Sequence, residues 1–150
     1  MLSQKAKYAL RALLVLAEEG DDKPLLIADI AERHNLPRKF LEQILLDLKH
    51  HGLVQSRRGR SGGYSLLKPA SEISFGQVVR IIDGPLAPLP CLSRMAYRRC
   101  EDCAGEESCA IRRVFALTHQ VTTTVLDRTT LADALREAPL EAGSTRPAVA

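Results

Sequence analysis

A stretch rich in glycine and arginine, residues 57–63, does most to limit how this chain can fold. It lies between two short segments in which apolar and polar residues alternate, Leu53–Ser56 and Tyr64–Leu67. Such alternation indicates strands, and glycines at the tip allow a tight turn and a close approach to another backbone. We therefore predict a β-hairpin whose tip carries Arg57, Arg58 and Arg60.

Three helices are predicted before this hairpin. Apolar residues recur at three- and four-residue steps over 3–19, where Ser3 is placed to cap the start. A short helix follows over 27–33, and a third begins at Pro37 and stops at Gly52. Two short helices joined by a tight turn and followed by a basic hairpin are typical of a winged helix-turn-helix. The predicted fold class is mainly α, with a small β-hairpin as its wing.

The second half of the chain predicts two more helices with a cysteine-containing loop between them. Ser74 is placed to cap a helix that ends at Asp83, and three prolines within 84–90 then favour an extended path. A long helix is predicted over 109–136, and its apolar stripe is longer than the preceding domain can cover, so part of it should meet a second chain. We therefore divide the chain into a winged-helix domain (1–83), a cysteine loop (84–108), a dimerisation helix (109–136) and a flexible tail (137–150).

Basic residues gather in the part of the chain that forms the predicted winged helix. The net charge is only +3, but residues 1–68 hold twelve Lys and Arg against eight Asp and Glu, and no acidic residue lies between Asp47 and Glu72. A basic stripe of this kind suits a polyanion such as double-stranded DNA, and a solvated surface is the alternative.

The predicted DNA contacts come from the third helix and the hairpin. In the first turns of that helix, Arg38 and Lys39 suit phosphate or guanine, Gln43 suits adenine, and Glu42 can accept from the cytosine amino group. Arginines at the hairpin tip suit a narrow minor groove, which is strongly electronegative. The predicted DNA-binding residues are Arg38, Lys39, Glu42, Gln43, Arg57, Arg58 and Arg60.

All four cysteines of the chain, Cys91, Cys100, Cys103 and Cys109, fall in one short segment. Thiolates are soft ligands that suit iron–sulfur clusters and zinc, and disulfides are rare in the cytosol. We predict that the four cysteines hold an iron–sulfur cluster. A structural zinc ion, a thiol redox switch and a thiol oxidoreductase using Cys100 and Cys103 are the alternatives.

Other functional classes have little support in the sequence. The oxidoreductase lacks a βαβ pattern, and no catalytic triad or phosphate-binding loop is evident, so we expect a protein that is not an enzyme. The longest early apolar run, Ala12–Ala17, falls far short of the roughly 20 residues that a membrane-spanning helix needs. We therefore expect a cytoplasmic protein with no membrane partner.

Several segments together resemble a known group of proteins, the IscR/NsrR/BadM group of bacterial winged-helix transcription regulators. The resemblance covers roughly residues 1–135 and is most specific in the winged helix. It rests on Lys7–Leu10, Ile30–Glu32, Phe40–Leu45, Gly52–Val54, Arg58-Gly59, Gly62–Tyr64 and Leu126–Asp133.

This resemblance implies a homodimer with crossed C-terminal helices that binds a near-palindromic operator, and we expect a repressor. By position, Glu42 matches the base-reading carboxylate of the group, Arg58 the wing arginine, and Cys91 and Cys109 the outer cluster ligands. Either Cys100 or Cys103 matches the middle ligand. The chain has Arg112 and Tyr8 where relatives place a fourth ligand, so four cysteines are the expected ligand set.

Overall fold

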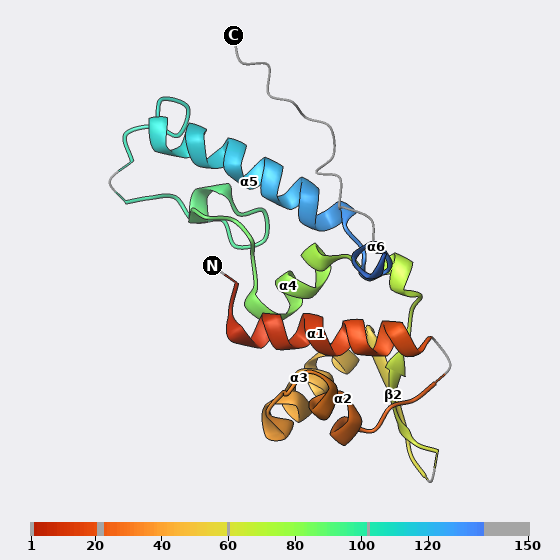
Figure 1. The fold of residues 1–150 in the computed structure, drawn as a ribbon. Helices are drawn as coiled ribbons and strands as arrows, with labels where there is room; N and C mark the ends of the chain where they lie inside the picture. The colour runs from red at the N-terminus through yellow and green to blue at the C-terminus, as the bar shows by residue number, and fades with distance from the viewer. Residues whose placement is uncertain (1, 21–22, 60, 102, 137–150) are drawn as a thin grey trace.

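The computed structural model describes residues 2–20, 23–59, 61–101 and 103–136 (Figure 1). Its two strands pair antiparallel, and the rest of the regular structure is helical. The predicted winged helix-turn-helix is confirmed. The elements are α1 (Gln4–Glu19), α2 (Ile27–Arg33), α3 (Arg38–His50), β1 (Val54–Arg57), β2 (Gly63–Leu66), η1 (Ala70–Glu72), α4 (Phe75–Asp83), η2 (Pro90–Leu92), α5 (Ala110–Arg128) and α6 (Leu131–Leu135), where η denotes a 3-10 helix.

The core of the protein is built around α1. This helix begins at Ser3, whose side chain accepts a hydrogen bond from the Ala6 N–H. Its Leu13 and Leu16 side chains are fully buried, as are Ile44 and Leu45 of α3. On one side α1 contacts α2, α3 and β2, and on the other it contacts α4 and α6 (Figure 1). The aliphatic core therefore fixes α3 and the hairpin on the side of α1 that lies away from α5.

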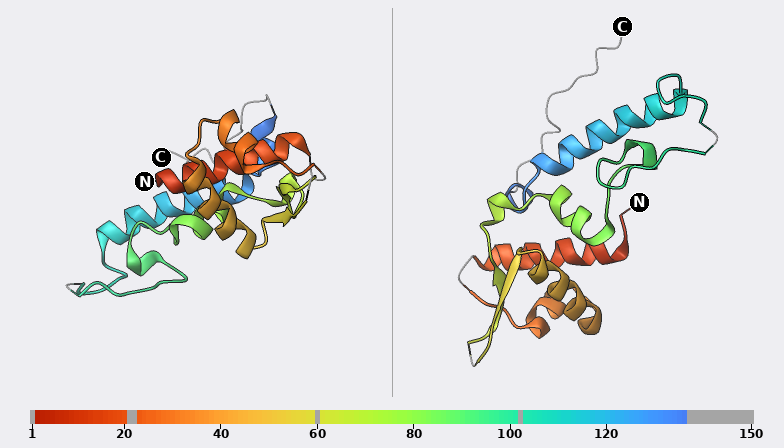
Figure 2. Two further views of the ribbon diagram at one scale, coloured as in Figure 1. Left: turned by 90° about the horizontal axis from the view of Figure 1, so that it is seen from below. Right: turned by 180° about the vertical axis from the view of Figure 1, so that it is seen from behind.

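The hairpin is anchored to the body at its base. Val54 pairs with Leu66 and Arg57 with Gly63. Gly63 has a φ of +146°, and the Leu25 backbone lies where a side chain at position 63 would be, so only glycine fits there. Leu25 and Tyr64 exchange backbone N–H···O hydrogen bonds of 2.8 Å each. The hairpin tip consequently projects from a fixed base (Figure 2).

The prediction of one helix over 109–136 is wrong, because the chain breaks between α5 and α6. The Thr130 side chain and the Asp133 carboxylate form a capping box that starts α6. The Phe75 N–H donates to the Thr129 carbonyl at 3.0 Å, and the Leu131 N–H donates to the Ile73 carbonyl at 2.9 Å. Leu131 is fully buried. Residues 131–135 thus pack in the winged-helix core, and the predicted tail, 137–150, lies outside the described residues.

Two prolines are placed slightly differently from the prediction. Pro37 is the N-cap of α3, so the helix itself begins at Arg38. Pro90 opens the short helix η2 instead of prolonging the extended path. Its fixed φ suits the first residue of a helix, where no backbone N–H is needed.

Candidate nucleic-acid interface and cysteine loop

The outer face of α3 carries the four predicted base- and phosphate-contacting residues of this helix. All four are exposed, while Leu41, Ile44 and Leu48 hold the inner face in the core. Arg38 Nε lies 3.6 Å from Glu42 Oε1, and this pair is open to solvent. An exposed ion pair contributes little to stability, so both side chains can exchange it for contacts with DNA. The exposed residues are Arg38, Lys39, Glu42 and Gln43.

The predicted arginines of the hairpin lie at its tip. Arg57 ends β1 and Arg58 follows it, and both are exposed. Gly59 has a φ of +105°, and a Cβ at Gly62 would lie 2.5 Å from the Arg57 carbonyl oxygen. The tight turn therefore favours glycine at both positions. Arg60 lies outside the described residues.

Side-chain contacts join α3 to its neighbours. Lys49 Nζ donates to Ser56 Oγ at 2.6 Å, which ties the end of α3 to β1. Lys5 Nζ donates to Asp47 Oδ2 at 2.7 Å, which ties α1 to α3. The sequence alone did not single out either pair, since nothing in the spacing of Lys5 and Asp47 indicates contact. The first contact holds the wing strand to α3, and the second holds α3 to α1.

The Lys5–Asp47 pair gives a prediction about pH. The hydrogen bond from Lys5 holds the pKa of Asp47 below its ordinary value. Because the pKa is lower in the folded than in the unfolded chain, the pair stabilises the fold at neutral pH, and this contribution is lost as the pH falls through the folded pKa. We expect Lys5→Gln to raise the pKa of Asp47, measured by NMR titration of its carboxyl carbon, and Lys7→Gln to leave it unchanged. An unaltered Asp47 titration in Lys5→Gln would contradict the pairing.

The four cysteines occupy different environments. Cys91 is buried in η2, Cys100 is exposed, and Cys103 and Cys109 are half-buried. Cys109 is the N-cap of α5, and its Sγ accepts from the Arg112 N–H at 3.4 Å. Among the described residues, no three cysteine, histidine or acidic side chains are grouped closely enough to hold a metal. The four predicted cysteine ligands therefore lie in one loop, but in this structure they are not close enough together to share one metal centre.

The donor chemistry of this loop nevertheless fits a thiolate-bound group. Cys109 lies at the start of α5, where a backbone N–H points at its sulfur. The Cys103 N–H donates to the Cys100 carbonyl at 3.4 Å, so a turn brings these two residues together. Cys91 lies within η2 and Cys109 caps α5, and these two elements are in contact with each other. Two thiols on fixed elements and two in a turn are a set that a cluster or a zinc ion can use.

Glu106 holds the cysteine loop against α5. It accepts a hydrogen bond from the Tyr97 hydroxyl and lies 3.4 Å from Arg112 Nε. The carboxylate raises the pKa of Tyr97, chiefly through this hydrogen bond, and Cys91 adds to the same shift. Tyr97, Glu106 and Arg112 were not predicted as site residues, because their role depends on how the loop folds back.

The outward face of α5 is apolar and uncovered. None of the α5 residues is buried, and its large apolar side chains on this face are 39–65% exposed. They recur at three- and four-residue steps, as in helices that pack side by side. This stripe consists of Ile111, Val114, Phe115, Leu117, Val121 and Val125.

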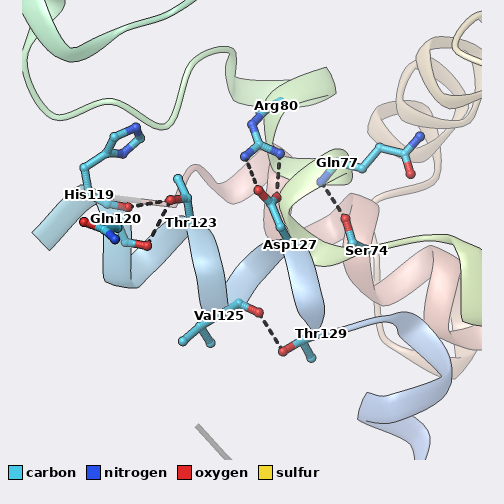
Figure 3. A network of polar contacts seen from close by, with 9 residues as sticks. All are labelled: Ser74, Gln77, Arg80, His119, Gln120, Thr123, Val125, Asp127 and Thr129. Carbon is cyan, nitrogen blue, oxygen red and sulfur yellow. Dashed lines mark hydrogen bonds and ion pairs between the residues drawn. The ribbon is translucent and has the colours of Figure 1, made fainter. Parts of the chain in front are cut away.

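One ion pair attaches the opposite face of α5 to α4. Arg80 donates two hydrogen bonds to Asp127, of 2.7 and 2.8 Å, and this pairing raises the pKa of Arg80 (Figure 3). Gly76 lies directly against Asp127, with no room for a larger residue. No local pattern relates Arg80 to Asp127, which lie 47 residues apart in the chain. The pair links the winged helix to α5 and thus to the cysteine loop.

A helix-turn-helix with exposed polar residues on its second helix, followed by an arginine-tipped wing, defines a winged-helix DNA-binding protein. Comparison of the sequence with protein families identifies the family within this class. A family model described as Rrf2, iron-dependent transcriptional regulator, matches residues 2–137. The chain therefore belongs to the Rrf2 family. It is a DNA-binding transcriptional regulator and not an enzyme, which removes the alternative of a thiol oxidoreductase.

Named relatives agree with this assignment. An rrf2-like protein of Rhodobacter capsulatus, described as an HTH-type transcriptional regulator, is 54% identical over 138 residues, which are 90% of this chain and 92% of the relative. The HTH-type transcriptional regulator IscR of Pectobacterium carotovorum is 36% identical over 129 residues, covering 86% of this chain and 71% of the relative. The resemblance seen in the sequence is thereby confirmed.

Solved structures show the same fold. CymR, the global cysteine regulator of B. subtilis, aligns with a TM-score of 0.75 at 31% identity, over 89% of this chain and 95% of CymR. IscR of T. potens aligns with a TM-score of 0.70 at 29% identity, over 93% of this chain and 88% of IscR. In the part of the chain that the structure describes, none of the helices has the length and apolar character needed to cross a membrane.

Proposed function

We propose that this protein is a homodimeric repressor that binds a near-palindromic operator and whose DNA affinity depends on an iron–sulfur cluster in the cysteine loop. The observation that carries the proposal is that the predicted DNA-binding residues and the cysteine loop lie on opposite sides of α1. The exposed reading face of α3 and the wing lie on one side of α1, and the cysteine loop and the bare face of α5 lie on the other (Figure 1).

In this proposal α3 enters the major groove and the wing reaches the adjacent minor groove. Glu42 accepts from a cytosine amino group and Gln43 pairs with adenine, while Arg38 and Lys39 contact guanine or phosphate. Gln43 Nε2 donates to Asp47 Oδ1 at 3.0 Å, which orients its side chain before DNA binds. Arg57, Arg58 and Arg60 supply the positive charge of the wing.

The dimer would form through the stripe on α5. Two copies of this helix packed along the stripe would cover side chains that are otherwise open to water. In such a dimer both copies of α3 would read one duplex, and their separation would have to match half-sites about 34–36 Å apart. Within the domain division made above, residues 84–108 form the sensor loop, and the dimerisation helix is α5 alone.

The cysteine loop is the proposed sensor. Cys91, Cys100, Cys103 and Cys109 would hold the cluster, and Arg99 and Arg112 would offset its negative charge. When bound, an iron–sulfur cluster supplies a redox-sensitive centre. The iron-dependent description of the family and the relatives named IscR support this choice. A structural zinc ion or a thiol switch is the second candidate, and the similarity to Staphylococcus aureus CymR, whose structure is known in an oxidized form, favours the thiol switch. Both a zinc site and a thiol switch need cysteines that are not locked in disulfides, as in the cytoplasm, where we propose that the protein acts.

The salt dependence of DNA binding tests the assignment of the wing as a DNA-binding element. We expect Arg58→Ala to weaken binding about tenfold and to lower the slope of log affinity against log salt by about 1, because one phosphate or groove contact is lost. The duplex is one selected from a random-sequence library, and affinity is measured by fluorescence anisotropy.

Arg113→Ala is the matched control, since Arg113 is an exposed arginine on α5, away from the wing. It should leave both affinity and slope unchanged. Equal effects of the two substitutions, or an affinity of the unaltered protein that does not respond to salt, would contradict the assignment of the wing.

A further inference from the structure

A hollow of about 480 Å³ lies between α5 and the segment that runs from the end of α4 to Met95. This volume falls within the range of natural small-molecule sites, about 300–1,000 Å³. The apolar part of its lining includes Leu86, Leu92 and Met95. The polar part includes His119 and Gln120 of α5 and Arg94 of the facing segment. A hollow lined by both apolar and polar side chains suits an amphipathic ligand.

The charges of the hollow do not cancel. Its one carboxylate, Asp127, is engaged by Arg80, so this pair is neutral as a unit. Arg94 is exposed, and no acidic group of the described residues pairs with it. In addition, His119 Nδ1 is buried and has no hydrogen-bond partner among those residues. Buried polar atoms normally have partners, so the His119 ring, which lines the hollow, has a hydrogen-bonding nitrogen that is not satisfied.

The hollow is separate from the proposed dimer contact. Its α5 residues, among them Ala116, Thr123 and Asp127, are spaced along one face of the helix. At 3.6 residues per turn, this face is opposite to the apolar stripe that includes Val114 and Val121. Figure 3 shows the Arg80–Asp127 pair between α4 and α5, with the His119 ring further along α5. A second copy packed along the stripe would therefore not cover the α5 residues that line the hollow.

We propose that this hollow binds a small organic acid, with the carboxylate on Arg94 and His119 and the apolar part against Leu86, Leu92 and Met95. Because Arg80 of α4 and Asp127 of α5 both line the site, a bound molecule would affect the ion pair that joins the winged helix to α5. Binding itself is independent of the proposed function. Only its effect on DNA affinity rests on that function.

The test uses the full chain without DNA and three probes of equal length: hexanoate, hexanamide and hexylamine. Binding is measured by isothermal titration calorimetry. We expect hexanoate to bind at least about tenfold more tightly than the other two, because only it forms a charge-assisted hydrogen bond with Arg94. Arg94→Gln should reduce hexanoate binding to the level of hexanamide, and Ala116→Leu, which fills the hollow, should weaken all three probes.

Arg98→Gln is the control, since Arg98 is an exposed arginine of the same loop that does not line the hollow. It should leave hexanoate binding unchanged. The inference is overturned if hexanoate does not bind, if it binds no better than hexanamide, or if Arg94→Gln has no effect. Because no DNA is present, such a failure is distinct from a failure of the proposed function, which is read from DNA affinity.

Discussion

The substitution Val121→Glu is expected to make the protein monomeric and to weaken DNA binding by about 100-fold or more. Val121 is half-exposed in the centre of the apolar stripe of α5. A carboxylate there would have to be buried between two helices without a partner, which is strongly unfavourable. Joining two DNA-binding modules raises affinity by roughly 10²–10⁴, and a monomer forfeits that gain.

Sedimentation equilibrium gives the oligomeric state, and fluorescence anisotropy with a selected duplex gives the affinity. Gln120→Glu is the matched control, because it adds the same charge on the opposite face of α5. It should leave the dimer intact. If Val121→Glu remains dimeric, or if both variants lose the dimer equally, the stripe is not the contact between copies.

The substitution Gly76→Ala is expected to destabilise the fold by about 1–3 kcal/mol, as overpacking of a well-packed site does. In most helix interiors the same change stabilises by roughly 0.5–1 kcal/mol. Here the new methyl group would overlap Asp127 Oδ1 and lie 3.1 Å from Arg80 Nη1. It would therefore separate Asp127 from Arg80 and loosen the junction between α4 and α5.

A double-mutant cycle isolates this effect. In an Asp127→Ala background the space is vacant, so Gly76→Ala should be neutral or stabilising. The free energy of unfolding is measured in urea at one fixed protein concentration, since dimerisation also contributes to stability. A stabilising Gly76→Ala on its own, or an equal cost in both backgrounds, would show that α4 and α5 do not meet through this contact.

The elements that could be predicted from the sequence are those with local signals. Ser3 and Ser74 cap their helices as expected, and the alternating segments around 57–63 form the hairpin. The break between α5 and α6 was missed although Thr130 and Asp133 have the spacing of a capping box. The apolar residues beyond it continued the helical pattern and outweighed that signal.

The candidate site could be predicted only in part. Exposure of the α3 face follows from its periodicity, so Glu42 and Gln43 could be named. The Arg80–Asp127 and Lys5–Asp47 pairs join residues far apart in the chain, and no spacing rule indicates them. The ligand set of the cysteine loop depends on how a long irregular segment folds, which composition and spacing leave open.

The most direct test combines metal analysis with DNA binding on protein purified without oxygen. Iron, acid-labile sulfide and zinc are measured first, and then the stoichiometry and affinity for a selected duplex are measured before and after the cluster is removed. We expect iron and sulfide, two chains per duplex, and a change in affinity of about tenfold or more, which is the usual size of an allosteric coupling. A monomer that holds neither iron nor sulfide and whose affinity for DNA is the same throughout would contradict the account.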